Sequence, residues 1–135
     1  TLAYYPYQNE TNLSELIDLN EANCLEALRM RYQKNQIYTN SSDVLVAINP
    51  YCALPLYQIP DEPYQLPRQP PELHKEPHVY QFVEKCLYPL FSRGVDQNIL
   101  VSGESGAGKT KTTSFITSYI EKRCGESADN FLSLE

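Results

Sequence analysis

The sequence predicts an α/β fold, and three observations carry that prediction. Segments with the 3, 4 spacing of apolar residues that is typical of helices alternate with short apolar runs rich in β-branched residues. A buried-strand pattern at 98–102 runs directly into a glycine-rich turn, and an amphipathic stretch follows that turn. Apolar residues make up 41% of the 135 residues, which excludes wholesale disorder and fits about one domain.

Charge and cysteine content exclude several classes of function. Eleven basic and 17 acidic residues leave a net charge of −6, so we expect no nucleic-acid partner and no anionic membrane surface. The longest apolar run, Val44–Ile48, is too short to span a bilayer. The cysteines form no C-x-x-C pair, which argues against a zinc or redox site, and we favour free thiols of a cytosolic chain over disulfides. They are Cys24, Cys52, Cys86 and Cys124.

The first third of the chain predicts a lead-in, a helix and a hairpin. Residues 1–11 show no helical period and read as irregular, and Asn12 or Ser14 is expected to cap a short turn through Leu16 and Ile17.

A helix is predicted over Asn20–Lys34, with Asn20 as its N-cap. Its apolar face is expected to hold Leu25, Leu28 and Tyr32, with Cys24 beside them. Arg29, Arg31 and Lys34 give the C-terminal half of this helix a positive charge, which suits the negative end of the helix.

A hairpin is predicted from the β-prone segment 36–39, the turn residues 40–43 and the apolar run 44–48. The continuous apolar run predicts that this second strand is buried on both faces, and Pro50 ends it.

Seven prolines in 55–77 predict an extended surface connection. Two P-x-x-P spacings, Pro60–Pro63 and Pro67–Pro70, would suit a docking ligand, but we favour a stiff loop. His74 and His78 stand four apart, and we read them as helix-entry residues rather than metal ligands because Pro77 separates them.

Two further helices are predicted. The first covers His78–Phe91, and Pro89 is expected to distort or end its last turn. The second covers Lys111–Arg123 with Phe115, Ile116, Tyr119 and Ile120 on one face, and the tail 124–135 is weakly determined.

The strongest motif is the segment 103–110, GESGAGKT, which matches G-x-x-x-x-G-K-[ST] in full between a predicted strand and a predicted helix. Its glycines allow backbone N–H groups to converge on phosphate oxygens, and the helix that follows directs its positive end to the same place. Lys109 supplies a charge for the β- and γ-phosphates, Thr110 can ligate Mg²⁺, and Glu104 is expected to point outward. An incidental glycine-rich turn is the alternative, and the strand–turn–helix context disfavours it. The predicted phosphate-binding residues are Gly103, Glu104, Ser105, Gly106, Ala107, Gly108, Lys109 and Thr110.

The chain resembles the N-terminal part of a myosin motor domain. The matching segments follow the family's order: LRMRY (28–32), IYT (37–39), VLVAINPY (44–51), LPLY (54–57), PHVY (77–80) and NILVSGESGAGKTKTT (98–113).

The resemblance implies a partial P-loop NTPase fold, in which residues 1–135 are an incomplete, N-terminal portion of the motor head with a mixed, largely parallel sheet flanked by helices. It implies Mg-ATP as ligand, Lys109 as a catalytic residue, and adenine contacts from Asn49, Pro50 and Tyr57. It also implies a cytoplasmic, cytoskeleton-associated motor that binds actin through regions absent here and carries light chains in its full length.

The chain departs from the family's pattern at several positions. Lys111 stands where many relatives carry an acidic residue, and its added charge near the phosphates places it among the predicted binding residues. Ser42-Asp43 replaces a glycine turn, and Ala53 stands at an often basic position on the adenine side.

Two alternatives remain open from the sequence: a pseudo-motor scaffold that binds nucleotide without turnover, and another P-loop NTPase. The chain lacks the Asn-Lys-x-Asp motif of GTPases, which argues against a GTPase as the second alternative. No acidic Mg²⁺ ligand on a further strand follows Thr110, so we expect the isolated chain to have negligible ATPase activity. We also expect it to be marginally folded, because an isolated piece of a parallel sheet leaves its edges unpaired and its apolar faces uncovered.

Overall fold

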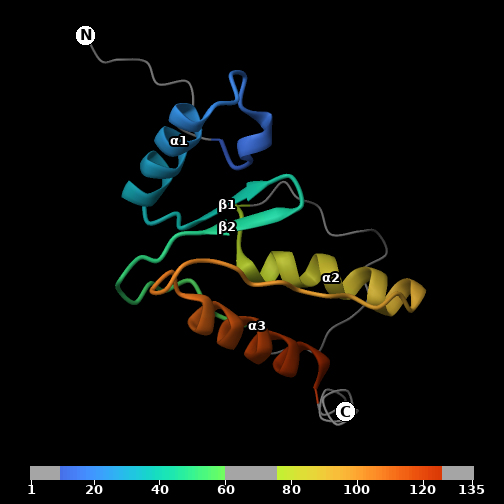
Figure 1. The fold of residues 1–135 in the computed structure, drawn as a ribbon. Coiled ribbons are helices and arrows are strands. Elements are labelled where there is room, and N and C mark those ends of the chain that lie inside the picture. Colours follow the sequence, from blue (N-terminus) through green and yellow to red (C-terminus); the bar gives the residue numbers. More distant parts are fainter. Residues whose placement is uncertain (1–9, 60–75, 126–135) are drawn as a thin grey trace. The chain divides into compact units, whose positions relative to one another are not determined.

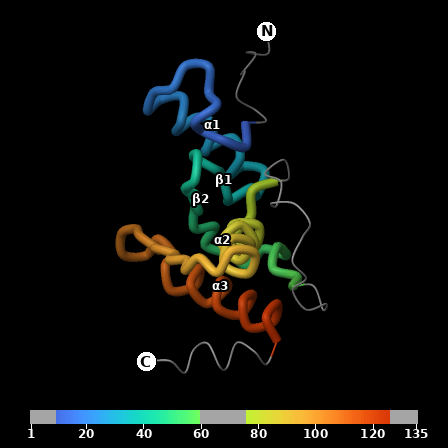
Figure 2. The backbone as a smooth tube through the Cα atoms, turned by 90° about the vertical axis from the view of Figure 1, so that its right-hand side faces the viewer, coloured from blue at the N-terminus to red at the C-terminus, as the bar shows by residue number. Residues whose placement is uncertain are grey.

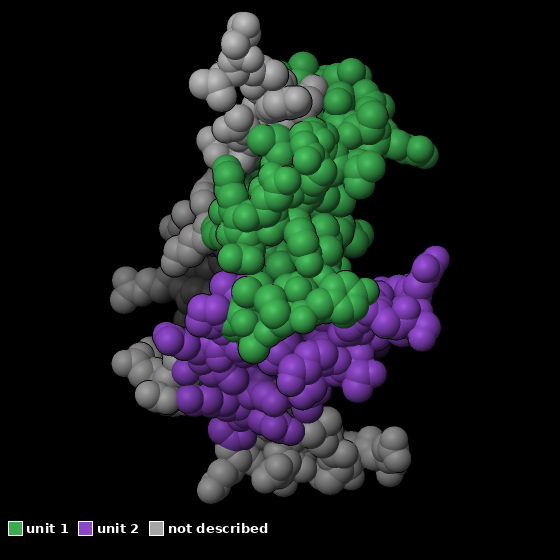
Figure 3. Space-filling model, turned by 90° about the vertical axis from the view of Figure 1, so that its left-hand side faces the viewer, with its two compact units in different colours: residues 1–54, 75–78 green, residues 55–74, 79–135 purple. Residues whose placement is uncertain are grey.

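The structure, a computed structural model, describes residues 10–59 and 76–125 (Figure 1). The described residues form two compact units, coloured separately in Figure 3: unit 1 holds 10–54 and 76–78, and unit 2 holds 55–59 and 79–125. Most of the predicted lead-in 1–11, the proline-rich connection 55–77 and the tail 124–135 lie outside the described residues, as does His74.

Unit 1 opens with a short 3₁₀ helix, η1 (Leu13–Glu15), capped by Asn12 as predicted. The Asn12 side-chain oxygen accepts from the backbone N–H of Ser14 at 3.2 Å and also from that of Ser42 at 3.1 Å. One amide side chain therefore caps the turn and ties it to the hairpin. Ile17, which we had expected within this turn, lies beyond it and is exposed.

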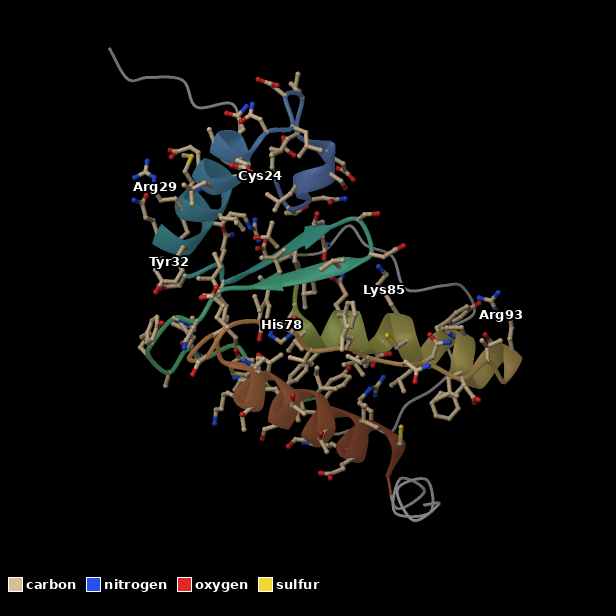
Figure 4. All side chains as sticks on the ribbon, viewed as in Figure 1. Cys24, Arg29, Tyr32, His78, Lys85 and Arg93 are labelled. Carbon is tan, nitrogen blue, oxygen red and sulfur yellow. The ribbon has the colours of Figure 1, made fainter. Side chains whose placement is uncertain are left out.

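Helix α1 (Glu21–Gln33) confirms the predicted helix, and the Asn20 side chain caps it by accepting from the Asn23 N–H at 2.9 Å. The predicted apolar face is wrong in part, because Leu25 and Tyr32 are exposed. The buried residues are instead Ala27 and Arg31, with Cys24 and Leu28 partly buried against the core of this unit. Figure 4 shows Arg29 on the outer side of the helix, where it pairs with Glu26.

Strands β1 (Tyr38–Ser41) and β2 (Val44–Ala47) form the predicted antiparallel hairpin, with Tyr38 opposite Ala47 and Ser41 opposite Val44. A single parallel bridge joins Asn12 to Asn40 beside β1. The expectation that β2 is buried on both faces is wrong: Val44 is 63% exposed. Among the described residues β2 pairs only with β1, and none of its four residues is fully buried.

Arg31, one of the charges predicted to suit the C-terminal end of α1, is 1% exposed. Its guanidinium donates from Nε to Thr39 Oγ1 at 2.9 Å and from an η nitrogen to the Tyr38 carbonyl at 2.7 Å, and it forms an ion pair with Glu76. A buried charge is tolerated only when it is paired and hydrogen-bonded in this way. Arg31 therefore joins α1, β1 and the segment 76–78 of the same unit.

Unit 2 is built on helices α2 (Val79–Arg93) and α3 (Lys109–Cys124), which pack side by side (Figures 1 and 2). Both predicted helices are confirmed, and α3 begins two residues earlier than expected. Pro89 does not end α2, which continues to Arg93 at its C-terminal end (Figure 4). Gly94, with φ of 62°, ends it by donating to the Leu90 carbonyl at 3.0 Å. The buried side chains of the two helices are Val79, Tyr80, Val83, Leu87, Ile116 and Tyr119.

The predicted buried strand at 98–102 is not a strand in the structure, and Leu100 is 91% exposed. A strand exists only as part of a ladder, and the described residues offer this segment no partner strand. The largely parallel sheet implied by the resemblance therefore stays a prediction.

Two simpler expectations can be compared with the described residues. The four cysteines are free thiols, as favoured from the sequence. No helix within 10–59 and 76–125 has the length and apolar character needed to cross a bilayer.

We predict that Arg31→Met lowers the free energy of unfolding by about 2–3 kcal/mol, because it leaves the Thr39 hydroxyl and the Tyr38 carbonyl without their charged donor. Arg29→Met on the same helix is the matched control; its side chain is 56% exposed, so the variant should unfold nearly as the parent does. Urea unfolding of the three purified proteins measures the difference. Equal losses in both variants would show that the burial of Arg31 carries no stability.

Candidate phosphate-binding site

The turn at 103–110 adopts backbone conformations that require glycine. Gly106 and Gly108 have φ of 82° and 97°, in the left-handed region that side chains disfavour. A Cβ added to Gly103 would lie 3.1 Å from the Cβ of Ala107, closer than such atoms normally approach. The turn is therefore a narrow backbone loop in which three positions exclude side chains.

The Lys109 ammonium folds back over this loop. Its Nζ donates to the Gly103 carbonyl at 2.6 Å and to the Glu104 carbonyl at 2.8 Å. A lysine has three N–H donors, so these two bonds leave one for a further acceptor. The Lys109 side chain thus reaches from the end of the 103–110 turn back to the two carbonyls at its start.

The N-terminus of α3 follows directly, with Gly108 as its N-cap. The backbone N–H of Thr112 makes the first bond within the helix, to the Gly108 carbonyl at 2.9 Å. The amides of Lys109, Thr110 and Lys111 accordingly have no acceptor inside the helix and lie at its positive end. This set of donors matches the chemistry of an anionic oxygen.

An open hollow of about 620 Å³ lies along α3, lined by Val101 and by the side of the helix that carries Lys109, Thr110 and Thr113. Thr110 is exposed there, so its hydroxyl is accessible. Glu104 is exposed as well, in keeping with the predicted outward position. The hollow brings the cation and the hydroxyl of the motif to one surface.

Polar contacts near the C-terminal half of α3 fix its position against α2. The Tyr119 hydroxyl donates to Glu84 Oε1 at 2.5 Å, and Arg123 Nε donates to the same oxygen at 2.9 Å. The ring of Tyr119 also stacks on that of Tyr80, with centroids 4.2 Å apart. Burial, and then the hydrogen bond to Glu84, raise the pKa of Tyr119 well above its ordinary value of 10.

Tyr57, predicted on the adenine side, lies in the same unit as the loop. Its ring stacks on Phe115 of α3, with centroids 3.6 Å apart and planes 13° apart, and meets Tyr80 edge-on at 6.1 Å. Lys111 Nζ lies 5.1 Å from the centroid of the Phe115 ring. Sequence reasoning gave Phe115 only a core role; the i, i+4 spacing from Lys111 was the signal that could have linked it to the site.

Asn49 and Pro50 belong to unit 1, which is described apart from the loop, so their adenine role stays a prediction. The Asn49 side-chain oxygen accepts from the Tyr51 N–H at 2.9 Å, and its carbonyl accepts from the Tyr32 hydroxyl at 3.4 Å. Within 10–59 and 76–125 no group of three His, Cys, Asp or Glu side chains could hold a metal ion.

Comparison with known proteins identifies close similarity across most of the chain. The family described as "Myosin head (motor domain)" matches residues 10–133. The chain is 45% identical over 109 residues to the Myosin-J heavy chain of Dictyostelium discoideum, covering 81% of this chain and 5% of that protein. It is 39% identical over 112 residues to the unconventional myosin-IXb of Rattus norvegicus, covering 82% and 6%. The chain thus spans only a small part, 5–10%, of the length of these curated relatives.

We predict that Tyr119→Phe reduces the loss of stability in alkaline solution. A pKa raised by folding means that the folded state holds the phenolic proton more tightly, so this contribution is complete below about pH 10 and is lost as the pH rises. Between about pH 9 and about pH 11 the unfolding free energy of the variant should fall by roughly 1 kcal/mol less than that of the parent. Tyr51→Phe, at a tyrosine that is 83% exposed, is the matched control and should follow the parent. Identical pH dependence of Tyr119→Phe and the parent in urea unfolding would contradict the buried hydrogen bond.

Proposed function

Because the chain belongs to the myosin motor-domain family, we propose that it forms the ATP-binding part of an actin-based motor that hydrolyses Mg-ATP. The observation that carries the ATP-binding part is the G-x-x-x-x-G-K-[ST] turn, whose left-handed Gly108 leads into α3 with Lys109 lying across it. Because the chain spans a small part of its relatives, the motor activity belongs to the full-length protein.

The turn suits a triphosphate in shape and in donors. Side chains at Gly103, Gly106 and Gly108 would fill the loop or strain it, and glycine leaves the backbone open to close approach. The exposed amides at the start of α3 donate to phosphate oxygens, and the third N–H of Lys109 adds a charge-assisted bond. In this proposal Ser105, Ala107 and Lys111 line the same phosphate path, and Lys109 is the residue that stabilises charge on the transferred phosphoryl group.

Magnesium fits the same site through Thr110. Its hydroxyl is exposed on the hollow beside Lys109, within the part of the chain that the phosphates would reach. When bound, Mg²⁺ neutralises phosphate charge and orients the triphosphate. Thr110 would hold the ion, and Tyr57 with Asn49 and Pro50 would contact the adenine.

The same proposal covers the properties implied for the whole protein: a P-loop NTPase core with a largely parallel sheet, actin binding through segments outside this chain, light chains, and a cytoskeletal location. A scaffold that binds nucleotide without turnover is the alternative. The variants below separate the two.

We predict that Lys109→Ala in the full-length protein weakens ATP binding by on the order of 100-fold, because a charge-assisted contact is lost in the phosphate loop. Lys122→Ala is the matched control on the same helix: Lys122 Nζ donates to the Ile59 carbonyl, away from the loop, so affinity should stay near that of the parent. Titration with a fluorescent ATP analogue measures both.

Actin-activated ATPase and actin co-sedimentation complete this experiment. A motor loses turnover in Lys109→Ala and no longer releases actin on addition of ATP. Unchanged partner binding without ATP turnover in the parent protein would support the scaffold instead, and unchanged ATP affinity in Lys109→Ala would refute the phosphate-loop assignment.

We predict that Thr110→Val makes nucleotide binding less dependent on magnesium. The hydroxyl is removed at nearly constant volume, so the gain in ATP affinity on adding Mg²⁺ should shrink by about tenfold, the loss of one contact worth about 1.4 kcal/mol. Thr112→Val, at the half-buried threonine two residues on, should keep the parent's response. Affinity measured with Mg²⁺ and with a chelator gives the ratio, and an unaltered ratio in Thr110→Val would exclude this hydroxyl as a ligand.

A further inference from the structure

Three side chains of unit 2 form a column that the nucleotide-binding motif does not include. Phe115, in the middle of α3, stacks face to face on Tyr57 at 3.6 Å, and Lys111 places its ammonium 5.1 Å from the centre of the same ring. Both Tyr57 and Phe115 are half-buried. The column joins the helix behind the phosphate loop to the segment 55–59, which belongs to no helix or strand.

This contact determines where Tyr57 lies relative to the loop. Phe115 stands six residues after Lys109 on one continuous helix, about 9 Å along its axis, so its position relative to the loop is fixed by the helix itself. The 13° angle between the rings fixes the plane of Tyr57, and the edge-on ring of Tyr80 limits its rotation further. A second bond from α3, from Lys122 Nζ to the Ile59 carbonyl at 3.2 Å, holds the end of the segment.

We propose that Phe115 is a positioning residue for nucleotide binding: its ring holds Tyr57 in the orientation that receives the base while the loop holds the phosphates. The proposal rests on the proposed ATP-binding function. Tyr57 lies in an irregular segment, and without Phe115 its side chain would have to be immobilised when the nucleotide binds. Because the stack already orders the Tyr57 side chain in the folded protein, this entropy is not lost on binding. The affinity for the base therefore rises through preorganisation, without a contact between Phe115 and the nucleotide.

Lys111 strengthens the same column. A cation over an aromatic face is attracted to it, and the i, i+4 spacing on α3 places the two side chains on one side of the helix. The Lys111 ammonium is thereby directed towards the Phe115 ring.

The test compares two ligands on the full-length protein: ATP, which carries the base, and inorganic tripolyphosphate, which does not. Phe115→Ala should weaken ATP binding by about five- to tenfold, while tripolyphosphate affinity changes by less than about twofold. Phe115→Tyr keeps the ring and should retain the parent's ratio of the two affinities. Ile120→Ala, a half-buried apolar residue more than one turn further along α3, is the matched control and should leave the ratio unchanged.

Each other outcome overturns the proposal. Unchanged affinities for both ligands in Phe115→Ala show that the stack does not position the base, and an equal loss of affinity for both ligands shows a structural role alone. If Phe115→Ala does not fold, Phe115→Leu keeps the apolar volume without the ring and is measured in its place. Failure of the parent to bind either ligand refutes the proposed function itself, an outcome distinct from loss of selectivity in the variants.

Discussion

The carboxylate of Glu84 holds the helix that carries the phosphate-binding turn. One of its oxygens accepts from both Tyr119 and Arg123, so α3 is attached to α2 by two hydrogen bonds to a charged acceptor, the stronger kind. Three side chains proposed for the site lie on α3: Lys109 and Thr110 at its start, and Phe115 in its middle. The direction of the helix N-terminus, and with it the convergence of backbone donors, depends on this anchor.

In unit 1, as in unit 2, single polar side chains make several hydrogen bonds at once. The Asn12 side-chain oxygen accepts from the Ser14 N–H, the Ser14 hydroxyl and the Ser42 N–H, and the Arg31 guanidinium satisfies acceptors from two segments, β1 and 76–78. The apolar cluster there is small: Leu13, Leu16 and Ala27, with partly buried neighbours, and Ile37 and Tyr38 are buried as well. With little apolar area to bury, shared hydrogen bonds specify the arrangement of η1, α1 and the hairpin.

Local signals in the sequence predicted the helices, the hairpin and the phosphate turn. The Asn20 cap, the Ser42-Asp43 turn and the glycine pattern act between residues close in the chain, and the structure follows them. The buried face of α1 could not be read this way, because the buried Arg31 is paired with Thr39, Tyr38 and Glu76, which come later in the sequence. The stack of Phe115 on Tyr57 was hidden for the same reason, and the predicted strand at 98–102 fails because a ladder needs a partner strand that no local pattern supplies.

The two bonds that Lys109 makes to the Gly103 and Glu104 carbonyls have a geometric consequence. They close a ring that runs through the turn and returns along the lysine's own four-carbon stem. The length of the Lys109 side chain therefore limits the distance between the start of α3 and the Gly103 and Glu104 carbonyls. An arginine at this position would carry the same charge on a three-carbon stem that ends in a larger, planar head, and would require a loop of different width. At Lys109 the reach of the side chain thus matters as much as its charge.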